Sequence, residues 1–458
     1  MGKLRFAIAL TAAKLSVIAL KITKRNGTNF PGVVAIRICP DFLKYINRPE
    51  KIIAVTGTNG KTTVSNLLRD VLAQAGKTVL NNGLGSNIAS GIATCLISGV
   101  NIFNVEKYKA AVLEVDERSA LRIFPYVKPD WMIVTNLSRD SIMRNAHPEY
   151  IRKILEDNIP PETKLILNAD DLLSAGIAPK NERVYFGIEK MEGDAQESVN
   201  LINDMQICPR CHTKLKYEYV RYSSIGKAYC PNCDFRSPEY DYAAYNVDVR
   251  SMSMDIRTGD ESEHFSLMNE GTFNIYNQVA VITAMHELGY SLSEIKGFMS
   301  KVDIVKTRYN VTECGDKTVT MLLSKDKNAY AGSRVFEYIA SQPGDKEVIL
   351  MMNCLGDVKH WSENTCWLYD CDFEFLNGHG IKHIIVTGPR EKDYKLRLLM
   401  AGVPEDIISA CETETDAPGL LRLFENDNIY ILYGTDSIVL AGKVKAGVIA
   451  AIGEEGTK

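Results

Sequence analysis

Short apolar runs recur along the first part of the chain, and each run ends in polar residues. Four of them cover residues 52–55, 110–113, 131–134 and 164–167, with helical patterns in between. Nearly continuous apolar runs of this length are typical of strands that are covered on both faces of a parallel sheet. The pattern therefore predicts an α/β domain with a doubly wound parallel sheet, in which a ligand binds at the carboxyl ends of the strands.

Three further apolar runs lie near the end of the chain, at residues 347–352, 383–388 and 429–433. They predict a second, smaller Rossmann-like α/β domain. With 458 residues, of which 45% are hydrophobic, the chain can build two or three domain cores. The predicted boundaries are a helix and linker over 1–49, a central domain over 50–305 with an insertion at 205–237, and a C-terminal domain over 306–458.

The N-terminal run of residues 6–20 is apolar, but Lys14 interrupts it and Lys21, Lys24 and Arg25 follow it. Its continuous apolar part is far shorter than the ~20 residues that a membrane span needs. We therefore predict an amphipathic helix, which either packs on the central domain or lies on the inner surface of the membrane. The formal net charge of −4 gives no reason to expect a nucleic-acid partner, and we expect a cytoplasmic protein.

A loop of small residues follows the first predicted strand and precedes a helical pattern that begins at Val64. Such a loop can close its backbone N–H groups on phosphate oxygens, while the helix points its positive end at the anion. Lys61 can reach the β and γ phosphates, and Thr62 can ligate Mg²⁺. Val55 stands where the general P-loop pattern has its first glycine, so the loop has a short form. We predict that the chain binds ATP through Gly57, Thr58, Asn59, Gly60, Lys61, Thr62 and Thr63.

Glu114 directly follows the apolar run of residues 110–113. A carboxylate at the carboxyl end of a buried parallel strand is well placed to hold a metal ion beside bound phosphates. We therefore predict that Glu114 and Thr62 are the Mg²⁺ ligands. A solvated acidic turn is the alternative interpretation, and it fits Asp116 and Glu117 better than it fits Glu114.

Two Cys-x-x-Cys pairs, Cys208 with Cys211 and Cys230 with Cys233, are separated by 18 residues. Two such pairs can supply four thiolates to one tetrahedral Zn²⁺, which leaves no open position for catalysis. We therefore predict a structural zinc ribbon, with His212 at its surface. A disulfide pair or a redox site is the alternative, and a reducing compartment disfavours it. The other cysteines are scattered among apolar residues, which favours free core thiols.

The order of these motifs resembles that of the MurT family, the Mur-ligase-like subunits of the enzyme that amidates lipid II in bacterial cell-wall synthesis. The short loop is similar to that of Mur ligases and folylpolyglutamate synthetases, and the four-cysteine insertion is the most discriminating feature. The resemblance also rests on residues 30–35, 82–87, 91–93, 114–117, 135–137, 273–277 and 367–374.

The resemblance implies an activity and a partner. Members of this family use ATP and Mg²⁺ to turn the α-carboxylate of a D-glutamyl residue into an acyl phosphate, which ammonia converts to D-isoglutamine. No glutaminase motif is evident in this chain. The resemblance therefore implies a GatD-like class I glutamine amidotransferase as the second subunit of a heterodimer, and nucleotide contacts for Asn274, Asn277 and Arg308.

The chain departs from the family pattern at two places. Met143 stands where an aspartate is expected, and Asn364 stands where the family has the aspartate that completes the partner's glutaminase triad. Because an amide cannot stabilise an imidazolium as a carboxylate does, Asp357 is our candidate for that catalytic role, beside Lys61 and Glu114 in phosphoryl transfer. Two alternatives stay open: another Mur-type ATP-dependent amide ligase with a different acceptor, or a non-catalytic nucleotide-binding subunit.

Overall fold

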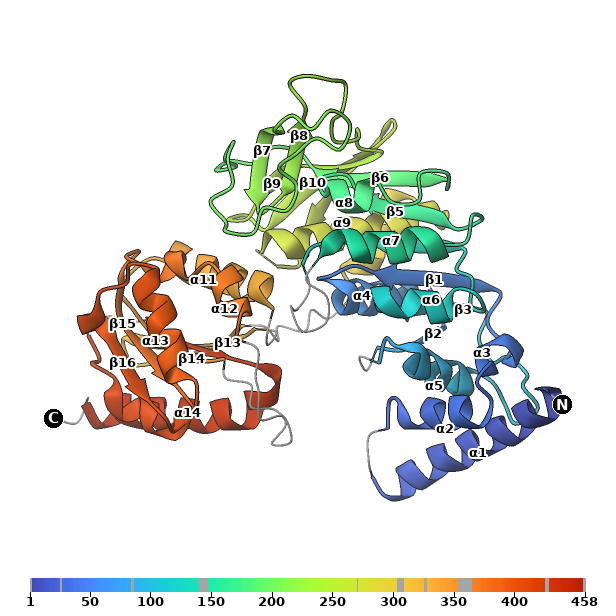
Figure 1. The fold of residues 1–458 in the computed structure, drawn as a ribbon, viewed down its shortest axis with the longest axis horizontal. Helices are drawn as coiled ribbons and strands as arrows, with labels where there is room; N and C mark the ends of the chain where they lie inside the picture. Colours follow the sequence, from blue (N-terminus) through green and yellow to red (C-terminus); the bar gives the residue numbers. More distant parts are fainter. Residues whose placement is uncertain are drawn as a thin grey trace. The chain divides into compact units, whose positions relative to one another are not determined.

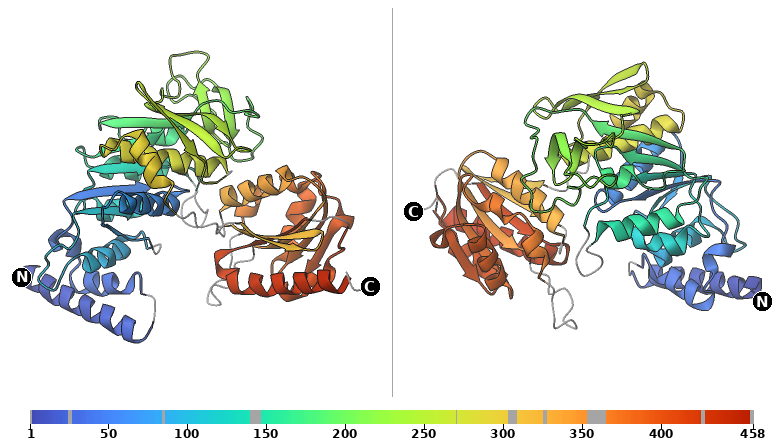
Figure 2. Two further views of the ribbon diagram at one scale, coloured as in Figure 1. Left: turned by 180° about the vertical axis from the view of Figure 1, so that it is seen from behind. Right: turned by 45° about the horizontal axis from the view of Figure 1, so that its top comes forward.

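The computed structural model describes residues 2–24, 27–83, 86–139, 147–269, 271–302, 309–324, 328–352, 365–424 and 428–455. Within these ranges the chain divides into two compact units (Figures 1 and 2). The larger unit comprises residues from 1–138, 147–198 and 204–304, and the smaller unit comprises residues from 139–146, 199–203 and 305–458.

The larger unit is built on a mostly parallel sheet. Among the described residues this sheet has nine strands, in the order β11-β10-β9-β6-β5-β4-β1-β3-β2. The strands are β1 (Lys51–Thr56), β2 (Val79–Asn81), β3 (Ala110–Glu114), β4 (Trp131–Val134), β5 (Lys164–Asn168), β6 (Arg183–Ile188), β9 (Tyr242–Asp248), β10 (Ser253–Thr258) and β11 (Glu261–Ser266). The four predicted strands are confirmed as β1, β3, β4 and β5, whereas the apolar pattern missed β2 and β6.

The strand order indicates where a ligand would bind on this sheet. β1 pairs in parallel with β3 on one side and with β4 on the other, although β2 separates β1 from β3 in sequence. The carboxyl ends of β1 and β3 therefore meet where the direction of strand addition reverses, which is the usual ligand position in such sheets.

Helices cover both faces of this sheet, and the core lies between them and the strands (Figure 1). The helix α9 is buried along most of its length, from Ile275 to Met285, and it packs against α4. The helices after β1 are α4 (Lys61–Gln74), α5 (Ala89–Gly99), η1 (Glu117–Ser119), α6 (Ala120–Ile123), α7 (Pro148–Asn158), α8 (Leu172–Ala175), α9 (Thr272–Glu287) and α10 (Leu292–Met299).

Three N-terminal helices, α1 (Gly2–Ile22), α2 (Phe30–Ile38) and α3 (Phe42–Tyr45), pack on the same unit. The ammonium of Lys14, which interrupts the apolar run, donates hydrogen bonds to the carbonyls of Ile97 and Val100 at the end of α5. A cation is favourable there because it satisfies carbonyls that the helix leaves unpaired. In the described part of the chain, no helix combines the length and hydrophobicity needed to cross a membrane.

Contact between α2 and α5 depends on Gly32. Its backbone N–H donates to the Thr94 hydroxyl at 2.8 Å. A Cβ at this position would lie 1.8 Å from the carbonyl oxygen of Ser90, so only glycine allows the two helices to approach this closely.

A two-stranded antiparallel ribbon, β7 (Lys216–Tyr222) and β8 (Ile225–Tyr229), is inserted between β6 and β9. It carries the four cysteines of the two predicted pairs on its flanking turns, and its small core includes Leu172 of α8. The insertion therefore packs on the sheet domain.

The smaller unit contains a sheet with the order β12-β13-β17-β14-β15-β16 among the described residues, antiparallel at β12 and otherwise parallel. Its strands are β12 (Tyr309–Cys314), β13 (Lys317–Leu323), β14 (Lys346–Met351), β15 (Ile381–Thr387), β16 (Ile408–Cys411) and β17 (Asn428–Tyr433). Its helices are α11 (Ala329–Ser341), α12 (Trp367–Asp370), η2 (Phe373–Leu376), α13 (Glu391–Met400), η3 (Glu405–Ile407), η4 (Glu414–Leu420), η5 (Thr435–Ser437) and α14 (Ile438–Glu455). The predicted strands near residues 350, 385 and 431 are confirmed as β14, β15 and β17.

Candidate functional site

The predicted phosphate loop connects β1 to α4 at the carboxyl edge of the sheet. Gly60 ends the loop with φ +87°, and a Cβ there would lie 2.3 Å from the side-chain oxygen of Asn277. Because Gly60 has no side chain to cap α4, the first N–H groups of the helix receive no capping bond from it. Free N–H groups at a helix N-terminus attract a phosphate.

The loop is held from one side by the segment that follows β4. The amide of Asn59 donates to the side-chain oxygen of Asn136 at 3.1 Å, and the hydroxyl of Thr58 accepts from the amide of Ser138 at 2.9 Å. By contrast, the side-chain Nδ2 of Asn59 is buried and has no acceptor among the described residues. A buried donor without an acceptor is costly, and a nucleotide oxygen would satisfy it. The loop therefore fits a phosphate ligand.

Lys61 forms a buried ion pair that the sequence did not reveal. Its Nζ lies 2.8 Å from Oε1 of Glu117, with side-chain exposures of 11% and 6%, and the same oxygen accepts from the amide of Gly57 at 3.1 Å. Burial alone would disfavour the ammonium, but the carboxylate of Glu117 outweighs this effect and raises the pKa of Lys61. The interpretation of Glu117 as part of a solvated turn is therefore wrong. Asp116 caps the short helix η1 instead.

Thr62 and Glu114 lie side by side. The hydroxyl of Thr62 donates to Oε2 of Glu114 at 2.9 Å, and Asn87 donates to Oε1 of Glu114 at 2.8 Å. Two oxygen ligands on adjacent corners of a Mg²⁺ octahedron are about 2.9 Å apart, given Mg–O distances of about 2.0–2.1 Å. The two predicted ligands therefore fit a magnesium ion without rearrangement.

The structure describes two of the three residues that the resemblance assigned to the nucleotide, and both lie on α9. Asn277 on α9 is buried against Gly60 of the loop. Asn274, one turn earlier, donates to the side chain of Asn269 at 2.8 Å. Arg308 lies outside the described residues, as do Met143, Asp357 and Asn364, so their assignments stay predictions.

The four cysteines of the insertion come together. The sulfur atoms of Cys208 and Cys233 are 3.6 Å apart, those of Cys211 and Cys230 are 3.4 Å apart, and all four lie within 4.8 Å of one another. Tetrahedral zinc with Zn–S bonds of about 2.3 Å places its sulfur ligands about 3.8 Å apart. A disulfide would need about 2.05 Å, and the cysteines in the described ranges are all free thiols. The cluster can therefore hold a zinc ion, and the disulfide alternative is excluded there.

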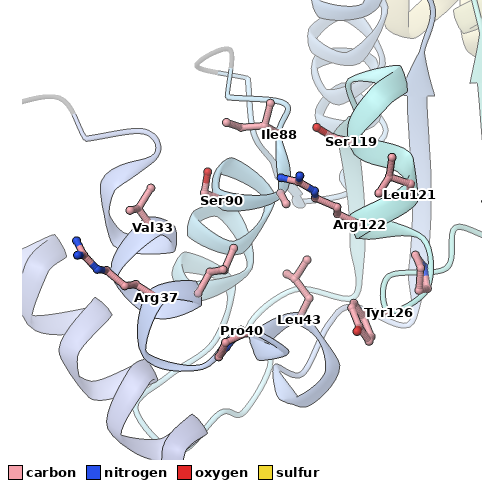
Figure 3. Close-up of a pocket in the computed structure, with 13 residues that line it drawn as sticks. Val33, Arg37, Pro40, Leu43, Ile88, Ser90, Ser119, Leu121, Arg122 and Tyr126 are labelled. Atoms are coloured by element: carbon pink, nitrogen blue, oxygen red, sulfur yellow. The ribbon is translucent and has the colours of Figure 1, made fainter. Parts of the chain in front are cut away.

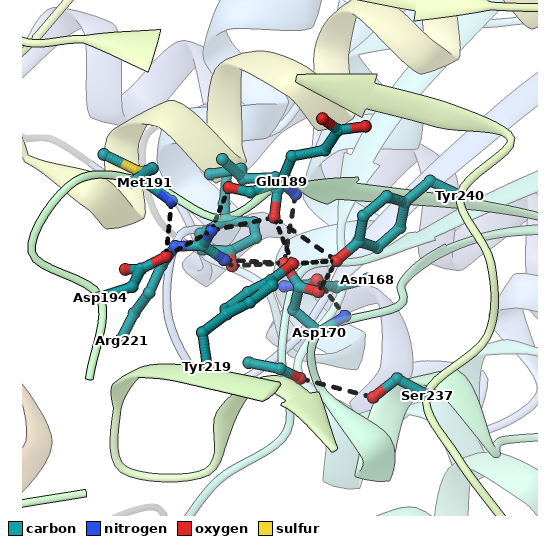
Figure 4. A network of polar contacts seen from close by, with 12 residues as sticks. Asn168, Asp170, Glu189, Met191, Asp194, Tyr219, Arg221, Ser237 and Tyr240 are labelled. Carbon is teal, nitrogen blue, oxygen red and sulfur yellow. Dashed lines mark hydrogen bonds and ion pairs between the residues drawn. The ribbon is translucent and has the colours of Figure 1, made fainter. Parts of the chain in front are cut away.

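A buried polar network joins the ribbon to the sheet (Figure 4). Arg221 of β7 contacts Asp170, which follows β5, at 3.1 Å, and it donates to the hydroxyl of Tyr276 on α9 at 2.6 Å. The hydroxyls of Tyr276 and Tyr240 both donate to Asp170, at 2.6 and 2.5 Å. Burial alone would lower the pKa of Arg221, but the facing oxygens raise it above its ordinary value. No local sequence pattern signals this network, because its members come from distant segments.

The residues of 367–374 in the smaller unit have structural contacts. Asp372 is buried and accepts from the side chain of Asn200 at 2.9 Å and from the amide of Leu201 at 2.6 Å. Arg397 donates to both carboxylate oxygens of Glu374, at 2.9 and 2.8 Å. The aromatic and acidic signature therefore anchors residues 199–203 and α13 to the core of this unit.

A cavity of about 720 Å³ lies between the N-terminal helices and the helices α5 and α6 of the sheet domain (Figure 3). Ile88, at the start of α5, is one of its lining residues. The preceding residue, Asn87, donates a hydrogen bond to Glu114. Arg37 of α2 and Arg122 of α6 also line it, and Arg122 projects towards the start of α5. Neither guanidinium has a carboxylate partner in the described part of the chain. The cavity is therefore positively charged.

Comparison with known proteins identifies the fold. A family model of the Mur ligase middle domain matches residues 55–233. The structure of a pseudomurein peptide ligase type C from Methanothermus fervidus is similar, with a TM-score of 0.66 and 19% identity, covering 88% of this chain and 79% of that one. The phosphate loop and the Thr62–Glu114 pair lie within the matched segment, and the fold is that of the Mur ligases.

Comparisons that include the C-terminal part of the chain identify a narrower family within the Mur ligases. A family model of the MurT ligase C-terminal domain matches residues 326–435. The MurT subunit of lipid II isoglutaminyl synthase from Staphylococcus aureus (strain COL) is 31% identical over 404 residues, which are 87% of this chain and 89% of that protein. The MurT subunit from Streptococcus pneumoniae (strain ATCC BAA-255 / R6) is 30% identical over 436 residues, 93% of each chain. The chain belongs to the MurT family.

Proposed function

We propose that this chain is the synthetase subunit that amidates the α-carboxylate of the D-glutamyl residue in the lipid II stem peptide. The product is D-isoglutamine, and the amino donor is ammonia from a GatD-like glutaminase partner. The observation that carries the proposal is the Thr62–Glu114 pair beside Lys61, in a chain that matches MurT proteins over most of its length. We expect the reaction to take place in the cytoplasm.

The residues around the loop have distinct roles in this proposal. The N-terminus of α4 and Lys61 bind the phosphates of ATP, and Asn59 donates its unpartnered N–H to a nucleotide oxygen. Thr62 and Glu114 would hold Mg²⁺, which would offset negative charge on the transferred phosphoryl group. The acceptor carboxylate attacks the γ phosphorus and ADP leaves. Ammonia then attacks the carbonyl carbon of the acyl phosphate, phosphate leaves with the bonding electrons, and the nitrogen gives up one proton to leave the amide.

The acceptor is proposed to enter through the cavity. Arg37 and Arg122 supply positive charge for the phosphate or carboxylate groups of an anionic substrate, and the apolar side chains there can cover its sugar or alkyl parts. The cavity wall includes Ile88, and the preceding residue, Asn87, donates to the Glu114 carboxylate, which supports the cavity as the acceptor site.

The zinc ion is proposed to be structural. Four thiolates complete its coordination, so it has no open position for a substrate. Asp357 is proposed to complete the triad of the glutaminase in the heterodimer, a role that the sequence resemblance alone supports.

The test is ATP-dependent amidation of lipid II by the chain purified with its candidate amidotransferase, with glutamine or ammonium as nitrogen source and product mass as readout. Product from both sources supports the proposal, and product from ammonium alone shows that the glutaminase coupling fails. The variant Glu114→Gln should lower turnover at least about a hundredfold, since it removes a metal ligand. ATP turnover with an amino acid acceptor and without lipid II amidation would favour a different amide ligase. ATP binding without turnover would favour a non-catalytic subunit.

A further inference from the structure

The outer face of α1 carries an apolar stripe that is interrupted by Thr11. Leu4, Ile8, Leu15, Ile18 and Ile22 have exposures of 53–77%. At about 100° per residue they fall within an arc of about 80° on the helix. The opposite face packs on the domain through Phe6, Ala9, Leu10 and Ala13. The helix therefore has two apolar faces, and only one of them is covered.

Such a surface is unusual on a globular protein. Exposed apolar side chains are common singly, whereas a contiguous row of large ones marks an interaction site. The α1 stripe runs the length of a 21-residue helix, about 31 Å at about 1.5 Å per residue. The predicted packing on the central domain is confirmed for one face of the helix, and it leaves the other face exposed.

The charge around the stripe indicates which kind of partner would bind to it. The first 40 residues contain seven Lys or Arg and no Asp or Glu, whereas the whole chain has a formal net charge of −4, so the other residues sum to −11. Lys3 and Lys21 flank the stripe on one side of the helix and Arg5 flanks it on the other. A basic helix with an apolar face is the pattern of a segment that lies in the interface of an anionic membrane.

We propose that α1 docks the protein on an anionic lipid surface, with the stripe Leu4, Ile8, Leu15, Ile18 and Ile22 inserted among the acyl chains and the flanking lysines at the phosphate level. A second copy of the chain is a poor occupant, because pairing two such faces would bring two clusters of positive charge together. The proposal does not depend on the reaction, since neither ATP nor an acceptor takes part in docking.

The test is co-sedimentation of the full chain with vesicles of phosphatidylcholine alone or with about 30% phosphatidylglycerol. We expect binding to the anionic vesicles, at least about tenfold weaker binding to the neutral ones, and loss of binding in high salt. The double variant I18S/I22S should weaken binding at least about tenfold, since it removes two inserted side chains. The matched control I102S/F103S changes two side chains that are 70% and 80% exposed elsewhere on the unit, and it should bind normally.

The contribution of the lysines to vesicle binding is tested by the same co-sedimentation assay. K21Q/K24Q should weaken binding about tenfold, while K77Q/K180Q removes two exposed lysines elsewhere and should have little effect. As a readout independent of affinity, an I18W variant should be quenched by brominated lipid more than F103W. Circular dichroism and urea unfolding check that each variant is folded.

Three outcomes would overturn the proposal. They are no binding to anionic vesicles, binding that I18S/I22S leaves unchanged, and a concentration-dependent dimer that I18S/I22S dissociates. The last outcome would identify a second copy as the occupant of the stripe.

Discussion

The guanidinium of Arg221 lies 3.1 Å from the carboxylate of Asp170, and both side chains are buried. Arg221 belongs to the cysteine ribbon, and Asp170 follows a central strand of the sheet. Tyr276 bonds to both of them from α9, and the next residue, Asn277, lies against Gly60 of the phosphate loop. The ribbon and the loop are therefore fastened to the same helix.

Loss of the cysteine cluster should weaken this attachment. The double variant C208S/C211S should contain no zinc and should unfold with a free energy lower by about 3 kcal/mol or more, because a structural metal contributes its binding free energy to folding. Metal content by mass spectrometry and urea unfolding of the larger unit measure both effects. The control C314S/C411S changes two half-buried cysteines outside the cluster and should retain zinc. Unchanged zinc and stability in C208S/C211S would refute the ribbon assignment.

The Lys61–Glu117 pair should affect both stability and binding. E117Q leaves the Lys61 ammonium buried without its carboxylate, which should lower the free energy of unfolding by about 3 kcal/mol. D116N keeps a side-chain oxygen that can cap the short helix η1, so it should cost well under about 1 kcal/mol. Urea unfolding and ATP titration calorimetry would compare them. Equal effects of the two substitutions would mean that Glu117 belongs to a solvated turn after all.

Asp171 should make stability depend on pH. Burial raises the pKa of its carboxyl from 3.8 to about 6, although it accepts from the amides of Leu137 and Leu173. Between these two values the folded state binds a proton that the unfolded state has released. Protonated Asp171 therefore stabilises the fold at low pH, and roughly 3 kcal/mol of this stability is lost as pH rises from about 4 to about 6.

The variant D171N isolates this contribution, because asparagine does not titrate. The native chain loses this stability as pH rises, and D171N does not. The free energy of unfolding of D171N minus that of the native chain should therefore increase by up to roughly 3 kcal/mol from pH 4 to pH 7. Urea unfolding at both pH values measures the difference. A constant difference between the two proteins across this range would show that Asp171 does not titrate there.

Two glycine-to-alanine substitutions should have opposite effects on the stability of the fold. G32A places a Cβ 1.8 Å from a carbonyl oxygen, so α2 must move away from α5 and stability should fall by about 2 kcal/mol or more. G297A lies in α10 with no atom within 4 Å of its new Cβ, and it should raise stability by about 0.5–1 kcal/mol because alanine favours the helix. Thermal unfolding compares both variants with the native chain. Stabilisation by G32A would contradict the close packing of the N-terminal helices.

Local patterns in the sequence were enough to predict the long strands, the loop after β1, the position of Glu114 at the end of β3, and the four-cysteine cluster. Each depends on residues that are adjacent or regularly spaced, such as an apolar run, a Gly-Lys-Thr triplet or a Cys-x-x-Cys pair. The strands β2 and β6 were missed because the first is short and the second is only partly buried, so neither forms a long apolar run.

Only the tertiary structure decided which distant groups meet. Glu117 looks solvated in the sequence, but the pairing of β1 with β3 brings it against Lys61, where the ion pair compensates its burial. The same holds for Arg221, Asp170 and Tyr276, which lie on three separate segments. The apolar composition of α1 likewise did not say which face packs and which stays exposed. A contact energy depends on position in space, and residues far apart in the chain acquire their relative positions only when the sheet and its helices assemble.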